Sequence, residues 1–104
     1  MKIQRALMFS AGLFVSTHVL ADGAALAKKS GCMTCHAVGS RMVGPSFKEV
    51  AAKYKGDQEA PAKLARKVRS GGSGSFGTTP MLPTPASVSD EDIKNIVAWI
   101  LTLN

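Results

Sequence analysis

The five residues Cys32-Met33-Thr34-Cys35-His36 decide how the rest of the chain is organised. They follow the pattern C-x-x-C-H, and on one turn of helix the first, fourth and fifth positions of such a run share a face. Two thiols and one imidazole can therefore meet the same flat ring, and this pattern is the attachment signature of a c-type haem. Cys32 and Cys35 are the only two cysteines of the chain, so no other thiol competes with them.

The start of the chain has the pattern of an export signal. A charged beginning precedes an apolar run from Ala6 to Val15, and Val19-Leu20-Ala21 offers a small-x-small cleavage site. The apolar run is shorter than the about 20 residues that a membrane span needs, which argues against an uncleaved anchor. We therefore predict that residues 1–21 are a cleaved signal peptide and that residues 22–104 form the mature domain.

The predicted domain is small and positively charged. Residues 22–104 hold all 7 acids and 11 of the 13 Lys and Arg residues, so their net charge is +4. A chain of this size buries only about 60% of the surface that its unfolded form exposes, so its core is marginal. A buried porphyrin would supply the missing apolar volume. We predict that the haem-free chain is largely unfolded.

Periodicity and capping signals predict an all-α fold, with about four short helices wrapped around one covalently attached haem. Strand signals are weak throughout, and the chain has no internal repeat. Each predicted helix has a capping residue or a first-turn proline at its start. The four are Gly23 to Ser30 after the cap Asp22, Phe47 to Tyr54 after the cap Ser46, a helix from Pro61 that stops at Gly71-Gly72, and a helix from Ser89-Asp90 that runs through Leu101.

A long loop from Gly71 to Val88 separates the last two predicted helices. It carries four glycines and three prolines and has no periodicity. Loops of this length in a small domain are usually functional. At its centre Pro80 and Pro83 stiffen the backbone on both sides of Met81. An electron-transfer haem with His and Met ligands needs a thioether on the open face of its iron.

Met81 could instead be a packing residue, as most methionines in proteins are. The other methionines are weaker candidates for this thioether. Met33 lies inside the attachment turn, on the His36 side of the ring. Met42 follows His36 by only six residues, so a path to the opposite face would be strained. Met81 has enough chain behind it to reach around the ring, and we expect it to be the second iron ligand.

At this point the chain resembles the small class I bacterial cytochromes c of the c-551/c-552 (c8) type. The resemblance covers essentially all of residues 22–104. Its marks are Gly31-Cys32-x-x-Cys35-His36-Ala37, Met42-Val43-Gly44-Pro45-Ser46-Phe47-Lys48, Val50-Ala51-Ala52-Lys53-Tyr54, Pro80-Met81-x-Pro83, and a Ser89-Asp90 helix that ends in Ala98-Trp99.

The resemblance implies one haem c per chain, held by thioether bonds at Cys32 and Cys35. It implies that His36 and Met81 are the axial ligands of the iron. It also implies that the Pro45 carbonyl accepts a hydrogen bond from His36 Nδ1, which would orient the imidazole and strengthen its donation.

Three positions depart from the family pattern near the haem. Phe76 replaces a tryptophan that lies near a propionate, and Lys67 replaces an arginine that often meets the propionate. A lysine is a point charge and cannot form the bidentate fork of an arginine. Thr84 takes the place of an asparagine that can contact the ligand sulfur. The family also crosses its first and last helices, and we expect Gly31 to face Ile96 at that crossing.

The implied function is that of a soluble periplasmic electron carrier, with no enzymatic activity. We expect a monomer that exchanges single electrons with redox proteins, such as a cytochrome bc1-type donor and a nitrite reductase, terminal oxidase or photosynthetic reaction centre as acceptor. The basic residues would steer it toward acidic partners, or they form only a solvated surface. We expect neither stable membrane insertion nor nucleic-acid binding, because no interleaved aromatics accompany the basic residues.

Two enzymatic alternatives and one metal site compete with this interpretation. A dithiol oxidoreductase would use Cys32 and Cys35, but it needs a reactive thiolate in a βαβ setting. A haem peroxidase would need Met81 to be labile. A structural zinc site would lack a fourth ligand, because His36 is the only histidine in residues 22–104.

Overall fold

The computed structural model describes residues 10–12 and 21–104. Nearly all of the predicted signal peptide lies outside these ranges, so its cleavage stays a prediction. The elements are α1 (Ala21–Lys29), the short 3-10 helix η1 (Cys32–Thr34), α2 (Phe47–Lys53), α3 (Ala60–Ser70) and α4 (Asp90–Ile100). The described ranges contain no strand, only an isolated bridge between Gly72 and Met81. The predicted all-α fold is confirmed.

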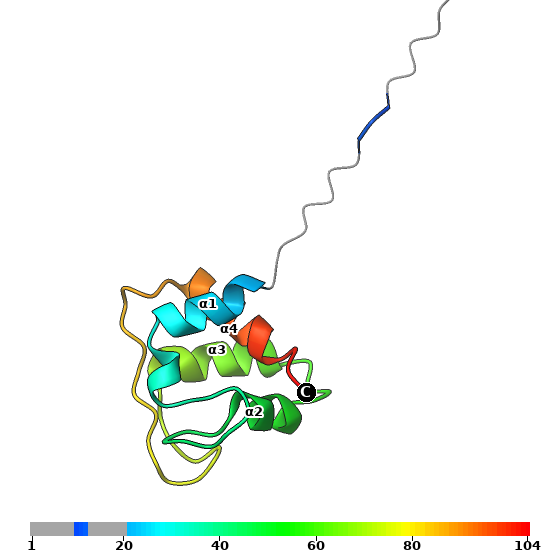
Figure 1. Ribbon diagram of the computed structural model, residues 1–104. Helices are drawn as coiled ribbons and strands as arrows, with labels where there is room; N and C mark the ends of the chain where they lie inside the picture. The colour runs from blue at the N-terminus through cyan, green and yellow to red at the C-terminus, as the bar shows by residue number, and fades with distance from the viewer. Residues whose placement is uncertain (1–9, 13–20) are drawn as a thin grey trace, which may run out of the picture.

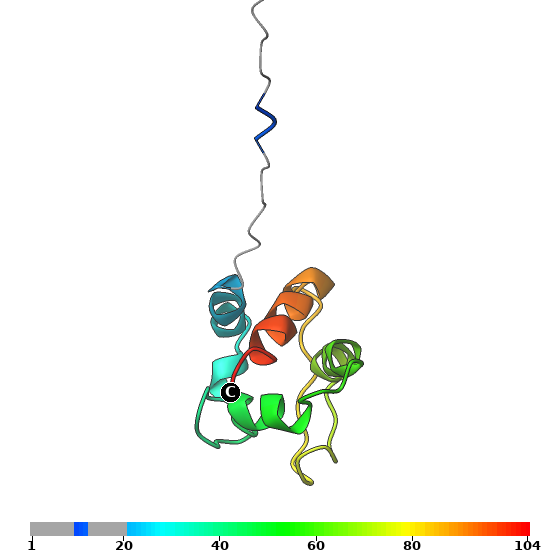
Figure 2. The same ribbon diagram turned by 90° about the vertical axis from the view of Figure 1, so that its right-hand side faces the viewer.

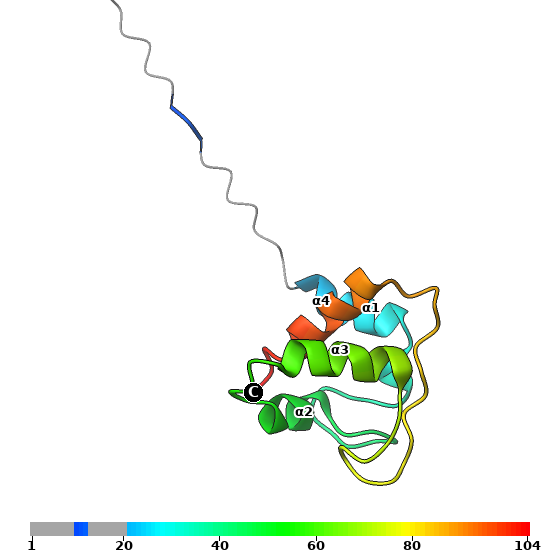
Figure 3. The ribbon, with the colours of Figure 1, turned by 180° about the vertical axis from the view of Figure 1, so that it is seen from behind.

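The helices surround a central space rather than forming a parallel bundle. Figure 1 shows α1 and α4 crossing at one end, with α3 in the middle and α2 at the other end. In the view of Figure 2, α1 and η1 lie on one side and α3 on the other. Figure 3 shows α3 from behind, where it lies across α4. The long loop after α3 runs past the open side of this arrangement before it reaches α4 (Figures 1 and 3).

The core lies where α4 packs against the other helices. α4 makes its largest contact with α1, a second one with α3 and a small one with α2. Its apolar residues recur at helical spacing, which places them on one face. The buried members of the core are Ala27, Phe47, Val50, Leu64, Ile93, Ile96, Val97 and Ile100. Among the described helices, none is long and apolar enough to cross a membrane.

The crossing of α1 and α4 depends on Gly23. A Cβ at this position would overlap the Trp99 side chain and would lie 2.9 Å from the Asn95 carbonyl oxygen. The predicted contact of Gly31 with Ile96 is wrong, because a Cβ on Gly31 would have no neighbour within 4 Å. Gly31 instead ends the helical segment with a φ of 84°, a conformation that glycine adopts without strain. α1 and α4 therefore approach each other closely at Gly23, eight residues before the expected position at Gly31.

Hydrogen-bonding side chains begin two of the helices, as their sequences predict. At α2 the Glu49 N–H donates to Ser46 Oγ (3.0 Å), and the Ser46 N–H donates to Glu49 Oε2 (2.7 Å). This reciprocal pair satisfies two N–H groups that a helix start leaves without partners. At α4 the Asp92 N–H donates to Ser89 Oγ at 3.1 Å.

The starts of the other two helices differ slightly from the predictions. α1 begins at Ala21, so Asp22 lies inside the first turn and is not the cap. Its negative charge there still favours the helix dipole. α3 begins at Ala60, one residue before Pro61. Asp57 Oδ1 accepts the Glu59 N–H at 2.9 Å just before α3.

Candidate functional site

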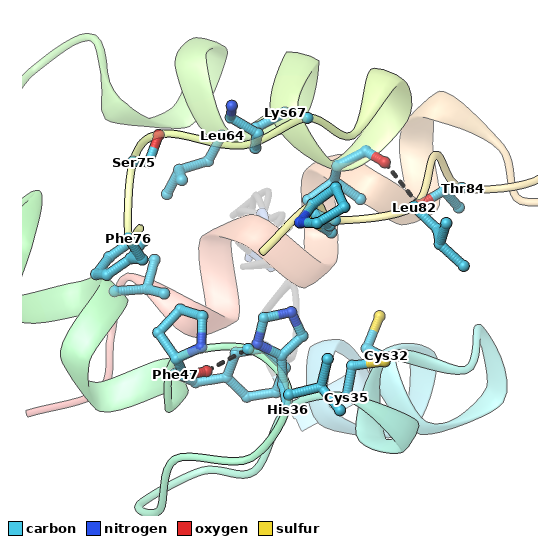
Figure 4. A pocket seen from close by; sticks show the side chains of 18 of the residues that line it. Cys32, Cys35, His36, Phe47, Leu64, Lys67, Ser75, Phe76, Leu82 and Thr84 are labelled. Atoms are coloured by element: carbon cyan, nitrogen blue, oxygen red, sulfur yellow. Dashed lines mark hydrogen bonds between the residues drawn. The ribbon is translucent and has the colours of Figure 1, made fainter. Parts of the chain in front are cut away.

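A cavity of about 710 Å³ opens in the centre of the molecule, a size typical of cofactor sites. One wall consists of η1 and the start of α2, and the opposite wall consists of α3 and the loop that follows it (Figure 4). The floor is apolar. Its side chains come from α2, α3 and α4, namely Phe47, Val50, Leu64, Val68, Ile96, Val97 and Ile100.

The two cysteines lie side by side in one wall of the cavity (Figure 4). Both are free thiols. The turn that carries them is closed by the Cys35 N–H and the His36 N–H, which both donate to the Cys32 carbonyl at 3.3 and 3.0 Å. Burial raises the pKa of the Cys32 thiol, and a backbone hydrogen bond opposes this shift only in part. The described residues contain no strand and hence no βαβ unit, the setting that a dithiol oxidoreductase needs.

His36 is held so that one ring nitrogen faces the cavity. Its Nδ1 lies 2.7 Å from the Pro45 carbonyl oxygen. Because a carbonyl oxygen can only accept, Nδ1 donates its proton to Pro45, which leaves Nε2 as the ring nitrogen that can bind a metal. Figure 4 shows Nε2 on the side of the ring away from Pro45, toward the open space. A neutral imidazole with this second contact is a common metal ligand.

Two further residues fix the plane of the His36 ring. Phe47 stacks on it with a centroid distance of 5.2 Å and an interplanar angle of 19°. Gly44 approaches the other side so closely that a Cβ would overlap Cε1 and lie 2.8 Å from Nδ1. Only glycine fits at position 44 while the imidazole keeps its hydrogen bond to Pro45.

Met81 enters the cavity from the loop after α3. Its N–H donates to the Gly72 carbonyl at 2.8 Å, and the Gly72 N–H donates to the Met81 carbonyl at 2.9 Å. The backbone of Gly71 also packs closely against residues 81–83, since a Cβ on Gly71 would lie only 2.8 Å from the Pro83 nitrogen. The competing methionines do not line the cavity: Met33 packs against the core, and Met42 is 51% exposed.

The three positions that depart from the family pattern also lie along the cavity. Lys67 reaches over the end of α3, where a Cβ on Gly72 would lie 3.4 Å from its Nζ. Lys53 places its Nζ 4.5 Å from the centroid of the Phe76 ring, and Lys53 also donates to the Ser75 carbonyl. The Thr84 hydroxyl donates its proton to the Val68 carbonyl at 2.7 Å. Lys67, Phe76 and Thr84 are labelled in Figure 4.

These residues fit a covalently bound haem. Two free thiols and a neutral imidazole line one wall, a thioether lies in the loop of the opposite wall, and the floor between them is apolar. In contrast, no three His, Cys, Asp or Glu side chains come together anywhere in residues 10–12 and 21–104. A zinc site therefore has no support in the described part of the chain.

The comparison with known families agrees with this geometry. Residues 20–104 match the family model described as cytochrome c. The chain belongs to the cytochrome c family. It is 51% identical to cytochrome c-551 of Allochromatium vinosum over 89 residues, which are 86% of this chain and 93% of that protein. It is 50% identical to cytochrome c2 of Rubrivivax gelatinosus over 82 residues, which are 78% of this chain and 96% of that protein.

A solved structure supports the same assignment. The crystal structure of Nitrosomonas europaea cytochrome c552 superimposes with a TM-score of 0.73 at 47% identity, and the match covers 78% of this chain and 99% of that one. The predicted resemblance to the c-551/c-552 cytochromes is thereby confirmed. As a small cytochrome c, the protein is an electron carrier with covalently bound haem c, and Cys32 and Cys35 occupy the attachment positions.

Sequence reasoning missed several residues that shape the site of this cytochrome c. In the sequence Gly44 is only one residue of a family motif, Gly71 only marks the end of a helix, and Phe47 only begins a predicted helix. Their roles depend on contacts with His36 and with the Met81 loop, which are distant in sequence or on the far side of a turn. The adjacent Gly44-Pro45 pair was the available signal, since glycine often marks a close approach of the backbone.

Proposed function

We propose that this cytochrome c is a periplasmic one-electron carrier whose haem iron is ligated by His36 and Met81. The observation that supports the proposal is that both residues line one cavity. His36 follows η1, and Met81 lies in the loop after α3. Met81 is also the one methionine of the described residues that lines this cavity.

Haem supplies a reversible one-electron Fe(III)/Fe(II) couple when it is bound. The protein sets the conditions of that couple. His36 keeps its Nδ1 proton on the Pro45 carbonyl, which fixes the ring and makes Nε2 a stronger donor. The thioether of Met81 favours the reduced state and raises the potential. The apolar floor keeps water from the cavity and lowers the local dielectric constant, which tunes the potential further.

Two protein ligands also explain why we propose a carrier and not an enzyme. With His36 on one face and Met81 on the other, no coordination position is left for a substrate. The contacts of Met81 with Gly72 hold this loop against the end of α3. A haem peroxidase would require that this attachment be released, so it is the less favoured function.

The rim of the cavity supports a proposal about docking. Val43 and Leu82 line the cavity and are 61% and 78% exposed, so they offer apolar side chains at its rim. Exposed apolar side chains beside the site suit a weak, transient complex between redox proteins. The surrounding positive charge would steer the carrier toward acidic partners. We propose a cytochrome bc1-type donor and a nitrite reductase, terminal oxidase or reaction centre as acceptor, with the carrier itself a monomer.

The proposed location rests on the export signal in residues 1–21 and on the haem attachment pattern. The periplasm is also where such a carrier would meet membrane-bound donors and soluble acceptors.

A redox titration of the purified holoprotein, followed by its visible spectrum, tests the function directly. A carrier should titrate reversibly with one electron per haem, and its ferric form should turn over peroxide only slowly. Rapid peroxide turnover by the native ferric protein would favour the peroxidase instead. Electron exchange with an acidic redox protein should slow steeply as ionic strength rises. A rate independent of salt would remove the steering proposal.

A further inference from the structure

Arg69, near the C-terminal end of α3, makes more side-chain hydrogen bonds than any other described residue. Its side chain is only 31% exposed. All of its partners lie at or just before the start of α4, 15 to 21 residues away in sequence. The contacts are Nε and Nη2 to Asp90 Oδ1 (3.2 and 2.7 Å), Nη2 to the Val88 carbonyl (2.7 Å), and Nη1 to the carbonyls of Pro85 (3.1 Å) and Thr84 (3.5 Å).

Three of these four acceptors are backbone carbonyls of one irregular segment, residues 84–88. This segment connects Met81 to α4 and contains no helix or strand. The Pro85 carbonyl also accepts the Val88 N–H at 3.0 Å, and Arg69 supplies N–H partners to the Thr84 and Val88 carbonyls. The planar guanidinium, with its five N–H donors, can reach several of them at once.

The same end of α3 holds the chain on both sides of Met81. At Met81 itself, the backbone exchanges two hydrogen bonds with Gly72, which lies two residues after α3. After it, Thr84 donates to the Val68 carbonyl through both its N–H (3.2 Å) and its hydroxyl (2.7 Å). Arg69 extends this attachment to the last residues before α4. The returning part of the loop is therefore attached to α3, or to Gly72 just after it, by hydrogen bonds at Met81, Thr84, Pro85 and Val88.

The ion pair with Asp90 contributes little to this attachment. The Asp90 side chain is 95% exposed, and exposed ion pairs contribute about 0–1 kcal/mol. The charge-assisted hydrogen bond from Arg69 to the part-buried Val88 carbonyl (2.7 Å) is stronger, while the Pro85 contact is exposed and the Thr84 contact is long at 3.5 Å. The carbonyl contacts, rather than the carboxylate, are the part of this arrangement that holds the loop.

We propose that Arg69 is a positioning residue for Met81: its contacts with the Thr84, Pro85 and Val88 carbonyls set how readily the thioether leaves the cavity. This inference rests on the proposal that Met81 ligates the iron. Releasing the thioether requires the loop to move away from α3. Each contact that must break in this movement lowers the population of the open state.

Imidazole binding to the ferric holoprotein measures this opening. Its neutral nitrogen forms a bond to the iron where the sulfur–iron bond breaks, and no electron or proton is transferred. The apparent affinity is reduced by the fraction of molecules in which the site is open. The variants are Arg69→Gln, Asp90→Asn and the charge-matched control Arg66→Gln, which removes one positive charge from an exposed position of the same helix.

We expect Arg69→Gln to raise the apparent imidazole affinity about tenfold, which corresponds to about 1.4 kcal/mol. Arg66→Gln and Asp90→Asn should stay within about twofold of the wild type. A change below twofold in Arg69→Gln, or an equal change in Asp90→Asn or Arg66→Gln, would overturn the proposal. Should Arg69→Gln fail to fold, Arg69→Lys must still raise the affinity at least about threefold, because a lysine cannot bind three carbonyls.

The Met–iron charge-transfer band of the ferric protein separates this inference from the proposed function. If the wild-type band is present and is lost in Met81→Ala, Met81 is the ligand, and the imidazole titrations then test Arg69 alone. If the wild-type protein lacks the band, the ligand assignment itself fails, whatever Arg69 does.

Discussion

Replacing Gly44 by Ala tests whether the backbone at this position fixes the His36 ring. The added Cβ would overlap Cε1 of His36 and lie 2.8 Å from Nδ1. The ring cannot move aside freely, because it is hydrogen-bonded to Pro45 at 2.7 Å and stacked on Phe47. Gly39→Ala is a matched control in the same loop, where a Cβ would have no neighbour within 4 Å. Neither glycine has a positive φ, so backbone strain does not enter.

The expected magnitudes follow from two opposing effects. Replacing a glycine by alanine at a compatible φ stabilises a protein by about 0.4–1 kcal/mol, through the unfolded state. Gly39→Ala should show only this gain. At position 44 the overlap of the added Cβ with the His36 ring costs about 1–3 kcal/mol. A weakened His36–Pro45 hydrogen bond costs about a further 0.5–1.5 kcal/mol. The free energy of unfolding of Gly44→Ala should therefore fall by about 0.5–4 kcal/mol.

Thermal and urea unfolding of the two holoprotein variants measure this difference. In a domain of 60–100 residues each kcal/mol shifts Tm by about 4–8 °C. The reduction potential of Gly44→Ala should also rise, because a displaced His36 loses part of the Pro45 contact that strengthens its donation. If Gly44→Ala is as stable as Gly39→Ala and keeps the wild-type potential, the close approach of Gly44 to His36 does not position the ring.

Three further predictions concern the fold and its pH dependence. Gly23→Ala should lower the free energy of unfolding by about 1–3 kcal/mol, because the added Cβ would meet Trp99 and Asn95. This cost should exceed the gain from the higher helix propensity of alanine. An unchanged or higher urea midpoint would contradict the close crossing of α1 and α4. Ser46→Ala removes the buried cap of α2 and should cost about 1 kcal/mol in the same assay, and a wild-type midpoint would show that the capping box is not needed. The hydrogen bond from Lys63 and then the Glu59 N–H lower the pKa of Asp57, so its stabilising effect is present above the usual aspartate pKa of about 3.9 and is lost as the pH falls through the lowered pKa. Asp57→Asn should thus be less stable than the wild type at pH 7 and approach it in acid, whereas an equal difference at both pH values would contradict this assignment.

The helices could be predicted from the sequence because their signals are local. Ser46 and Ser89 each lie three residues before an acid, and the Ile93–Ile100 stretch repeats at helical spacing. The helix crossing could not be predicted in the same way. Gly23 and Gly31 look alike in sequence, and only the direction in which α4 returns decides which of them meets Trp99.

In the site, too, features with a local sequence signal could be predicted, whereas contacts between distant residues could not. The C-x-x-C-H pattern could be recognised because its chemistry depends on residue type and spacing, and the role of Met81 between its two prolines stays a prediction. The contacts of Gly44 with His36 and of Arg69 with residues 84–88 depend on how the chain folds back on itself. In the sequence Arg69 is one of several basic residues in the third predicted helix, and nothing near it indicates a partner 15 or more residues away.

The central claim is that the iron of this cytochrome c is closed on one face by His36 and on the other by Met81. The most direct test is the Met–iron charge-transfer band of the ferric holoprotein, recorded for the wild type, Met81→Ala and the control Met42→Leu. We predict that the wild type and Met42→Leu show the band and that Met81→Ala loses it. A band that persists in Met81→Ala would contradict the account.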